Sequence, residues 1–192
     1  VHQVHFMQNL ELIKKLQEEK LIYGIGVSVS APTEELIKAL KSVPNTVCHV
    51  INGIWNEKTA EMMAYRNLKV LILGYKELRR GNEYIATHDE AVASNKKWLY
   101  NSLEKLIKRF KLISFDNLAI EQLNVKRLLS DAEWEEFYQG DDGTSTFYID
   151  AINQKFARSS TAAFDKRYPI DNLSMDEMFK IITDEYKEEK SK

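Results

Sequence analysis

The chain has 192 residues, of which 44% are hydrophobic, with 27 Lys and Arg against 29 Asp and Glu. Such a length suits one well-buried core with an extension, and the near-zero net charge gives no field that would draw the protein to nucleic acid or to an anionic membrane. There is no apolar run of roughly 18 residues and no signal-peptide pattern, so we expect a cytoplasmic protein without a membrane helix.

Short apolar runs alternate with segments of helical periodicity over the first hundred or so residues. The expected strands are residues 1–6, 21–30, 46–52, 68–74 and 112–116. The expected helices are residues 8–19, 33–41, 57–66 and about 89–110. This alternation predicts parallel strands of the α/β class, in a barrel or in an open doubly wound sheet.

The pattern changes after Phe110. A capping box beginning at Ser130 opens a short helix, and a second one beginning at Ser174 opens the last helix. Residues 144–150 and 155–159 are β-branched and aromatic around a turn at 151–154, which predicts a β-hairpin. We therefore expect a partial parallel (β/α) barrel over residues 1–110, and a C-terminal extension of helix and β-hairpin over residues 111–192 packed on it.

Polar residues follow the predicted strands, at the end where a parallel α/β sheet binds its ligands. Each of them alone would suit a helix cap or a turn, but four such groups at one rim favour a binding site. They are Ser28 and Ser30, then Asn52 and Gly53, then Gly74, Tyr75 and Lys76, and finally Asp116 and Asn117. Lys76, Arg79 and Arg80 form a basic cluster that could hold a carboxylate or a phosphate, although a solvated loop explains it equally well.

Other patterns are weaker. Gly24 and Gly26 supply two glycines of a dinucleotide-binding fingerprint, but the third is missing. His2 and His5 would point to opposite faces of a strand, so we expect no metal site there. Cys48 is the single cysteine, which excludes an intrachain disulfide and cannot by itself hold zinc or an iron–sulfur cluster.

Several runs resemble those of a known family. Tyr23-Gly-Ile-Gly-Val-Ser-Val-Ser30, Cys48-His-Val-Ile-Asn-Gly53 and Leu71-Ile-Leu-Gly-Tyr-Lys76 resemble strands four, five and six of radical S-adenosylmethionine (radical SAM) enzymes. Ser114-Phe-Asp-Asn-Leu-Ala119, Gln122-Leu-Asn-Val125, Gly140-Asp-Asp-Gly143 and Phe156-Ala-Arg-Ser-Ser-Thr161 resemble an uncharacterised subgroup of these proteins from phages and low-GC bacteria. The likeness covers nearly the whole chain.

This resemblance implies a six-stranded partial barrel, of which the chain begins at about the third strand. It places the cofactor's ribose at Ser28 or Ser30, and the adenine against Leu73, Gly74 and Tyr75. The family motif G-x-I-x-G-x-x-E, which supports the adenosyl group, falls on residues 49–56. Ile51 and Gly53 agree with it and Asn52 lies between them, whereas His49 stands in place of the first Gly and Asn56 in place of the Glu.

The family's three-cysteine loop, which holds a 4Fe-4S cluster, has no counterpart here. The resemblance therefore implies S-adenosylmethionine and the cluster as cofactors of a complete protein, neither of them bound by this chain alone. We expect a truncated gene, an expressed domain or one piece of a split enzyme, inactive as it stands. An open sheet edge at residues 1–6 then predicts a homodimer or a partner chain that completes the barrel.

The sequence leaves three functional hypotheses. In the first, the chain is the substrate side of a radical SAM enzyme, with Lys76, Arg79, Asp116 and Asn117 positioning the substrate. In the second, it is a non-catalytic protein-binding module that uses the hairpin and the aromatic residues Trp134, Phe137 and Tyr138. In the third, it is an ordinary barrel enzyme that binds a phosphorylated small molecule at Arg79 and Arg80.

Overall fold

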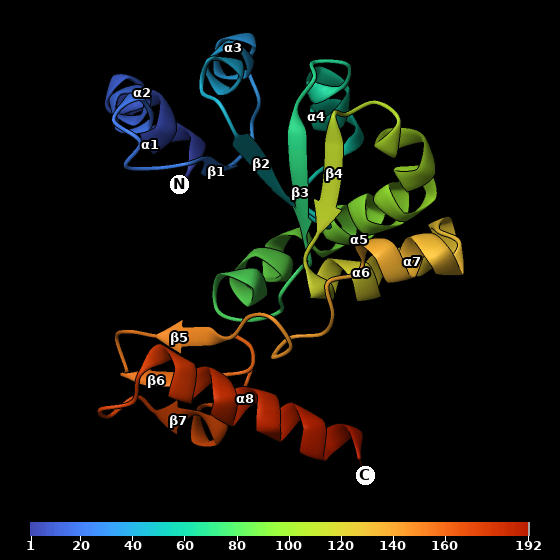
Figure 1. The fold of residues 1–192 in the computed structure, drawn as a ribbon. Helices are drawn as coiled ribbons and strands as arrows, with labels where there is room; N and C mark the ends of the chain where they lie inside the picture. Colours follow the sequence, from blue (N-terminus) through green and yellow to red (C-terminus); the bar gives the residue numbers. More distant parts are fainter. Residues whose placement is uncertain (192) are drawn as a thin grey trace. The chain divides into compact units, whose positions relative to one another are not determined.

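The computed structural model describes residues 1–191. Its larger sheet has four parallel strands (Figure 1). The strands are β1 (Ile25–Ser28), β2 (Thr46–Ile51), β3 (Lys69–Leu73) and β4 (Leu112–Phe115), in the order β1-β2-β3-β4. The helices α3 (Glu34–Ser42), α4 (Glu57–Met63) and α5 (Arg80–Ile107) connect one strand to the next. The predicted α/β class with parallel strands is confirmed.

Burial alternates along the strands, because successive side chains point to opposite faces of a sheet. One face is packed into the main core: Val27, Cys48, Val50, Val70 and Ile72 are each at most 1% exposed, and they lie in one cluster with Leu36, Leu40, Leu99, Leu103 and Leu106. The other face carries Ser28, His49 and Leu71, which are paired in register and all partly or fully exposed. We call this second face the open face of the sheet.

Side-chain caps fix where several helices begin. Thr33 accepts a hydrogen bond from the backbone N–H of Leu36 at the start of α3, and Asn56 forms a capping box with Thr59 at the start of α4. α5 begins at Arg80, earlier than the expected residue 89, and is kinked at His88. The hydrophobic periodicity of the sequence does not indicate the first turns of α5, because the buried side chains of this helix begin only at Val92.

The strand expected at residues 1–6 is wrong. Only the first two residues pair with the sheet: the Ser28 N–H donates to the Val1 carbonyl at 2.8 Å, and His2 forms a parallel bridge with Ser28. The helices α1 (Gln3–Gln8) and α2 (Leu10–Glu18) follow. His2 Nδ1 caps the Val4 N–H at 3.3 Å, and Phe6 is fully buried, which holds this segment as a helix. The edge strand of the sheet is β1, so no open strand edge exists at residues 1–6.

The chain divides into two compact units, Val1–Ser130 and Asp131–Lys192. β4 pairs with β3, so the segment 111–130 belongs with the sheet, together with α6 (Asn117–Leu123) and the short helix η1 (Val125–Leu128). In the described part of the chain no helix is long and apolar enough to cross a membrane.

The second unit has a small antiparallel sheet with helices. Its elements are α7 (Asp131–Phe137), β5 (Tyr148–Asp150), β6 (Lys155–Ala157), η2 (Phe164–Lys166), β7 (Tyr168–Pro169) and α8 (Met175–Lys190). β5 and β6 confirm the predicted hairpin, and β7 adds a strand that the sequence did not indicate. Phe156, Met178 and Ile182 form its core, and the predicted capping box of Ser174 and Glu177 begins α8.

Candidate functional site

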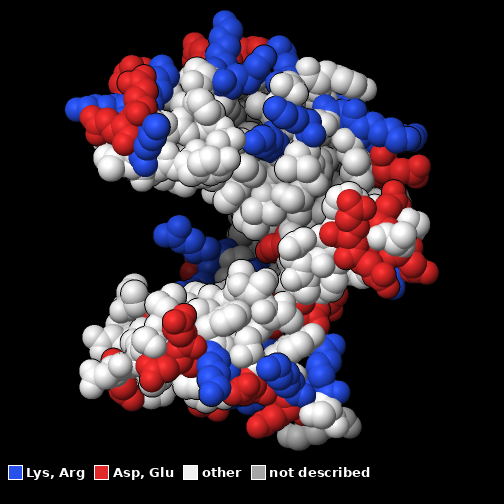
Figure 2. Space-filling model, in the orientation of Figure 1, with Lys and Arg blue, Asp and Glu red and all other residues white. Residues whose placement is uncertain are grey.

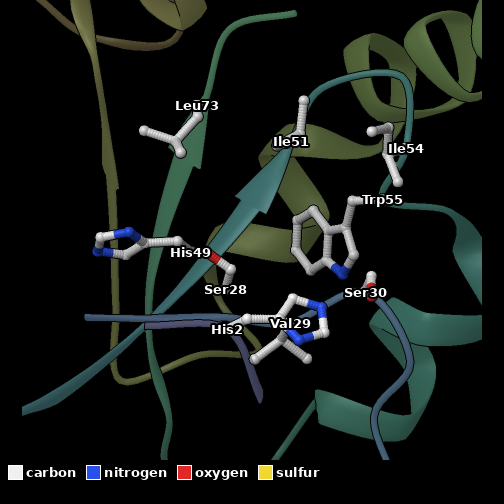
Figure 3. A pocket seen from close by; sticks show the side chains of 9 residues that line it. All are labelled: His2, Ser28, Val29, Ser30, His49, Ile51, Ile54, Trp55 and Leu73. Atoms are coloured by element: carbon white, nitrogen blue, oxygen red, sulfur yellow. The ribbon is translucent and has the colours of Figure 1, made fainter. Parts of the chain in front are cut away.

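A pocket lies on the open face, where β1, β2 and β3 end (Figure 3). Its volume is about 160 Å³, and it is lined by His2, Ser28, Val29, Ser30, His49, Ile51, Ile54, Trp55 and Leu73. We call it the Ser28 pocket. The parallel register brings these residues together, because Ser28 pairs with His49 and Ile51 pairs with Leu73. Three strand ends therefore contribute side chains to one cavity.

The walls of the Ser28 pocket combine apolar and polar groups. Ile51, Ile54 and Leu73 give aliphatic surface, and Ser28 and Ser30 bring two exposed hydroxyl-bearing side chains. This combination suits a ligand with a flat apolar part and a polar rim.

His49 occupies the opposite side of the pocket from Trp55 in Figure 3. Burial lowers the pKa of the His49 imidazole below its usual range. The imidazole is therefore neutral at pH 7, with one nitrogen able to donate and the other able to accept. Gly26 makes room for it, because a Cβ there would lie 2.5 Å from the imidazole Nε2.

A second and larger pocket, of about 430 Å³, adjoins the first and shares Ile51, Ile54 and Leu73 with it. Its other lining residues are Gly74, Tyr75, Lys76, Leu78, Arg80, Gly81, Tyr84 and Asp116. We call it the Arg80 pocket. The Asp116 carboxylate accepts hydrogen bonds from the backbone N–H groups of Gly74 and Ala119, each at 2.8 Å. This carboxylate is thus committed to the backbone, while Lys76 and Arg80 add positive charge to the wall.

A side-chain network holds the loop between the two pockets. Gln122 Oε1 accepts from Asn52 Nδ2 and from the Tyr75 N–H, and Gln122 Nε2 donates to the Tyr75 carbonyl, all at 2.9 Å. The Tyr75 hydroxyl donates to the Gly81 carbonyl at 2.7 Å. α6 therefore ties the end of β2 to the loop after β3.

The structure gathers most of the predicted site residues. Ser28, Ser30, Ile51 and Leu73 line the Ser28 pocket, and Gly74, Tyr75, Lys76 and Asp116 line the Arg80 pocket together with Ile51 and Leu73. Asn52, Gly53, Arg79 and Asn117 line neither. Asn52 is buried in the Gln122 network, Gly53 has a left-handed φ of +89° in the turn after β2, and Asn117 begins α6.

The sequence did not assign several of the lining residues to the site, among them His2, His49, Ile54, Trp55 and Tyr84, whereas Arg80 of the expected basic cluster does line a pocket. Trp55 lies in the turn between β2 and α4, where apolar periodicity gives no signal. A histidine within a strand is most simply interpreted as a core residue, but the side chain of His49 faces the pocket because β2 places it on the open face beside Ser28.

Metal ligands are not grouped at this site. Across residues 1–191, the structure contains no cluster of three or more His, Cys, Asp or Glu that could hold a metal ion. Cys48 points into the core at 1% exposure, and burial raises the pKa of its thiol to about 12. The thiol is therefore protonated and inert at neutral pH.

Comparisons of this chain with protein-family models, with curated proteins and with solved structures give no match. The radical SAM resemblance thus stays a prediction, and inferences about function rest on the geometry of the two pockets.

Proposed function

We propose that the chain is the C-terminal part of a radical SAM enzyme, and that the open face of its sheet supplies part of the S-adenosylmethionine pocket. One observation carries this proposal. Ser28, Ser30, Ile51 and Leu73, which the resemblance assigns to the adenosyl group, come from three strands and line a single cavity.

The strand order also supports the proposal. In a doubly wound sheet the strand order reverses at a switch point, whereas in a (β/α) barrel each strand lies beside the next one in sequence. The order β1-β2-β3-β4 has no reversal, and burial of one face leaves the other open, as on the inner side of an incomplete barrel. Part of a (β/α) barrel therefore fits this sheet better than a doubly wound domain does.

The residues of the Ser28 pocket suit an adenosyl group. Ile51 and Leu73 offer aliphatic surface to a purine, and the hydroxyl groups of Ser28 and Ser30 could bond to a ribose. Asn56, which stands where the family motif has Glu, uses its side chain to cap α4 at 3.0 Å from the Thr59 nitrogen. On this proposal, residues at the strand ends bind the adenosyl group without the Glu carboxylate of the family motif.

The 4Fe-4S cluster does not fit this chain. Such a cluster needs several cysteine thiolates, and the single cysteine of the sequence is protonated and faces the core. On this proposal the cluster's ligands come from outside residues 1–192, and the chain alone is not catalytic.

The Arg80 pocket is the proposed substrate side. It opens next to the Ser28 pocket, it has aliphatic and aromatic walls in Leu78 and Tyr84, and Lys76 and Arg80 give it positive charge. These features suit a substrate that carries a carboxylate or a phosphate on an apolar body.

Binding of S-adenosylhomocysteine, measured by isothermal titration calorimetry, tests the cofactor site without a cluster. Ser28→Trp fills the pocket from an exposed position, so we expect it to abolish binding while the fold is retained. Ser94→Trp makes the same change at an exposed position of α5 outside both pockets and should bind as the wild type does. Equal binding by both variants would contradict the proposed site.

A second candidate function is a protein-binding module, favoured by the surface of the second unit. Phe137 is 61% exposed on α7, beside a stacked pair formed by Trp134 and Tyr138 with ring centroids 4.5 Å apart. Figure 2 shows acidic side chains gathered over this helix, which contributes Asp131, Glu133, Glu135 and Glu136. A pull-down that retains no partner, with S-adenosylhomocysteine still binding, would reject this candidate.

A further inference from the structure

Trp55 occupies the turn between β2 and α4. Its backbone N–H donates to the Ile51 carbonyl at 2.8 Å, and its ring meets Trp98 and Phe110 edge to face, with centroids 6.1 and 5.8 Å away. The side chain is 3% exposed and belongs to the main core, yet one part of it forms a wall of the Ser28 pocket.

The indole nitrogen of this buried ring has no hydrogen-bond partner. Among the described residues none accepts a hydrogen bond from Nε1, although buried Trp N–H groups usually find an acceptor. Figure 3 shows this nitrogen on the side of the ring that faces His2 and Ser30, and both of these residues line the pocket. The unpaired donor is buried, and it lies on the side of the ring next to these two pocket residues.

Packing alone does not explain a tryptophan at this position. The edge contacts with Trp98 and Phe110 require an aromatic ring, and a phenylalanine would make such contacts without a donor to satisfy. The cavity of about 160 Å³ is several times the roughly 30 Å³ that one water molecule occupies in the liquid, so it has room for a larger group.

We propose that Trp55 Nε1–H donates a hydrogen bond to the ligand of the Ser28 pocket and thereby selects a ligand with an acceptor at that point. This inference rests on the proposed function and deepens it. For an adenosyl ligand, the acceptor is one of the adenine ring nitrogens or a ribose oxygen. Trp55 is then a specificity-determining residue, which no sequence motif of the chain indicates.

The wild-type protein can report this bond directly. The chain has three tryptophans, so its ¹H–¹⁵N spectrum has three indole signals, which single Trp→Phe variants assign. We expect S-adenosylhomocysteine to shift the Trp55 indole proton downfield and to move the Trp134 signal little. The analogues 1-deaza-, 3-deaza- and 7-deazaadenosine each lack one acceptor nitrogen of the adenine ring. We expect at most one of them to bind without shifting the Trp55 indole proton. If all three cause the shift, the acceptor lies on the ribose.

The affinities of two variants for S-adenosylhomocysteine separate the effect of the Trp55 N–H donor from the effect of ring packing. We expect Trp55→Phe to weaken S-adenosylhomocysteine binding about tenfold, the upper range for one neutral hydrogen bond. Trp98→Phe alters the neighbouring ring without touching the pocket and should change affinity less than twofold. If a ring nitrogen is the acceptor, the analogue that lacks it should bind Trp55→Phe and the wild type equally.

The outcomes also distinguish this inference from the proposed function. If S-adenosylhomocysteine binds but the Trp55 indole signal stays in place, or Trp55→Phe binds as tightly as the wild type, the bond from Trp55 is refuted and the adenosyl site stands. If none of the adenosine probes binds the wild-type chain, the adenosyl site and the inference both fail.

Discussion

Gln122 is the residue on which the rim of the two pockets depends most. Its amide makes three hydrogen bonds at 2.9 Å, one to the Asn52 side chain and two to the backbone of Tyr75. Asn52 is 1% exposed, so the bond to Gln122 satisfies a buried donor. An amide can do this because it both donates and accepts.

We expect Gln122→Ala to lower the free energy of unfolding by about 2 kcal/mol, because it leaves the buried Asn52 amide and the Tyr75 backbone without partners. Urea unfolding followed by circular dichroism measures this loss. Glu121→Ala, a neighbour with an exposed side chain, should change the stability by less than about 0.5 kcal/mol. A similar loss in both variants would refute the role of the amide.

Polar residues at strand ends could be predicted because they directly follow apolar runs, and Ser28, Ser30, Lys76 and Asp116 all line a pocket. Gln122 and Trp55 could not be assigned in this way. Their roles depend on partners far along the chain, such as the 70 residues that separate Asn52 from Gln122.

Among the elements, α6 is capped by a side chain that also accepts a hydrogen bond from the end of a strand. The Asp116 carboxylate accepts from the Ala119 N–H at the start of α6 and from the Gly74 N–H at the end of β3. Gly74 leaves no space for a side chain, since a Cβ there would lie 2.4 Å from the Leu118 Cγ. One side-chain oxygen thus joins the helix to the strand.

We expect Asp116→Ala to cost about 1–2 kcal/mol of stability, because both backbone donors lose their acceptor. Asp116→Asn keeps a side-chain oxygen at the same place and should recover most of the loss. Thermal unfolding of the two variants beside the wild type checks this. Equal destabilisation would mean that the negative charge, and not the accepted bonds, stabilises α6.

In the hairpin, the turn between β5 and β6 is held by Asp150. Hydrogen bonds from the side chain and the backbone of Asn153 lower the pKa of the Asp150 carboxyl, and the guanidinium of Arg167, 2.9 Å away, lowers it further. A carboxyl whose pKa is lower in the folded than in the unfolded state adds stability above about pH 4, the unfolded value, and loses it as the pH falls through the folded value.

The second unit should therefore lose stability on acidification below about pH 4. Asp150→Asn should be less stable than the wild type at pH 7 and should show a smaller loss between about pH 5 and about pH 2. Asp171→Asn, at an exposed carboxyl, serves as the control and should keep the wild-type dependence. An unchanged acid dependence in Asp150→Asn, measured by thermal unfolding at each pH, would exclude this carboxyl as its source.

Element types were predictable where periodicity was long, as in α5, and where caps were explicit, as in α8. Residues 1–6 were misassigned because a run of six with valine and phenylalanine fits a strand and a helix alike. Burial of Phe6 and the His2 cap decide in favour of the helix, and neither is visible in a local pattern.

At the scale of the molecule, the two units have separate cores. The cluster around the parallel sheet and the cluster of Phe156, Met178 and Ile182 share no residue. The alternation of strands and helices sufficed to predict the parallel sheet. It could not predict that one face stays open, since the runs Val70-Leu-Ile-Leu73 and Tyr23-Gly-Ile-Gly-Val27 are apolar at nearly every position.

Separate cores predict separate responses to core mutations. We expect Phe156→Ala to cost the second unit about 3–5 kcal/mol and to raise hydrogen exchange in β5, β6 and α8 while β2 and β3 stay protected. Leu103→Ala should have the converse effect. Exchange followed by mass spectrometry would contradict this separation if either variant exposed both sheets equally.

We propose that the carboxyl ends of β1, β2 and β3 form one adenosyl-binding site. Backbone amide shifts of the labelled chain during titration with S-adenosylhomocysteine test it most directly. We predict saturable shifts at Ser28, Ser30, Trp55 and Leu73, with the amides of α8 unchanged. Saturation with no shift at these strand ends, or with shifts confined to the second unit, would contradict it.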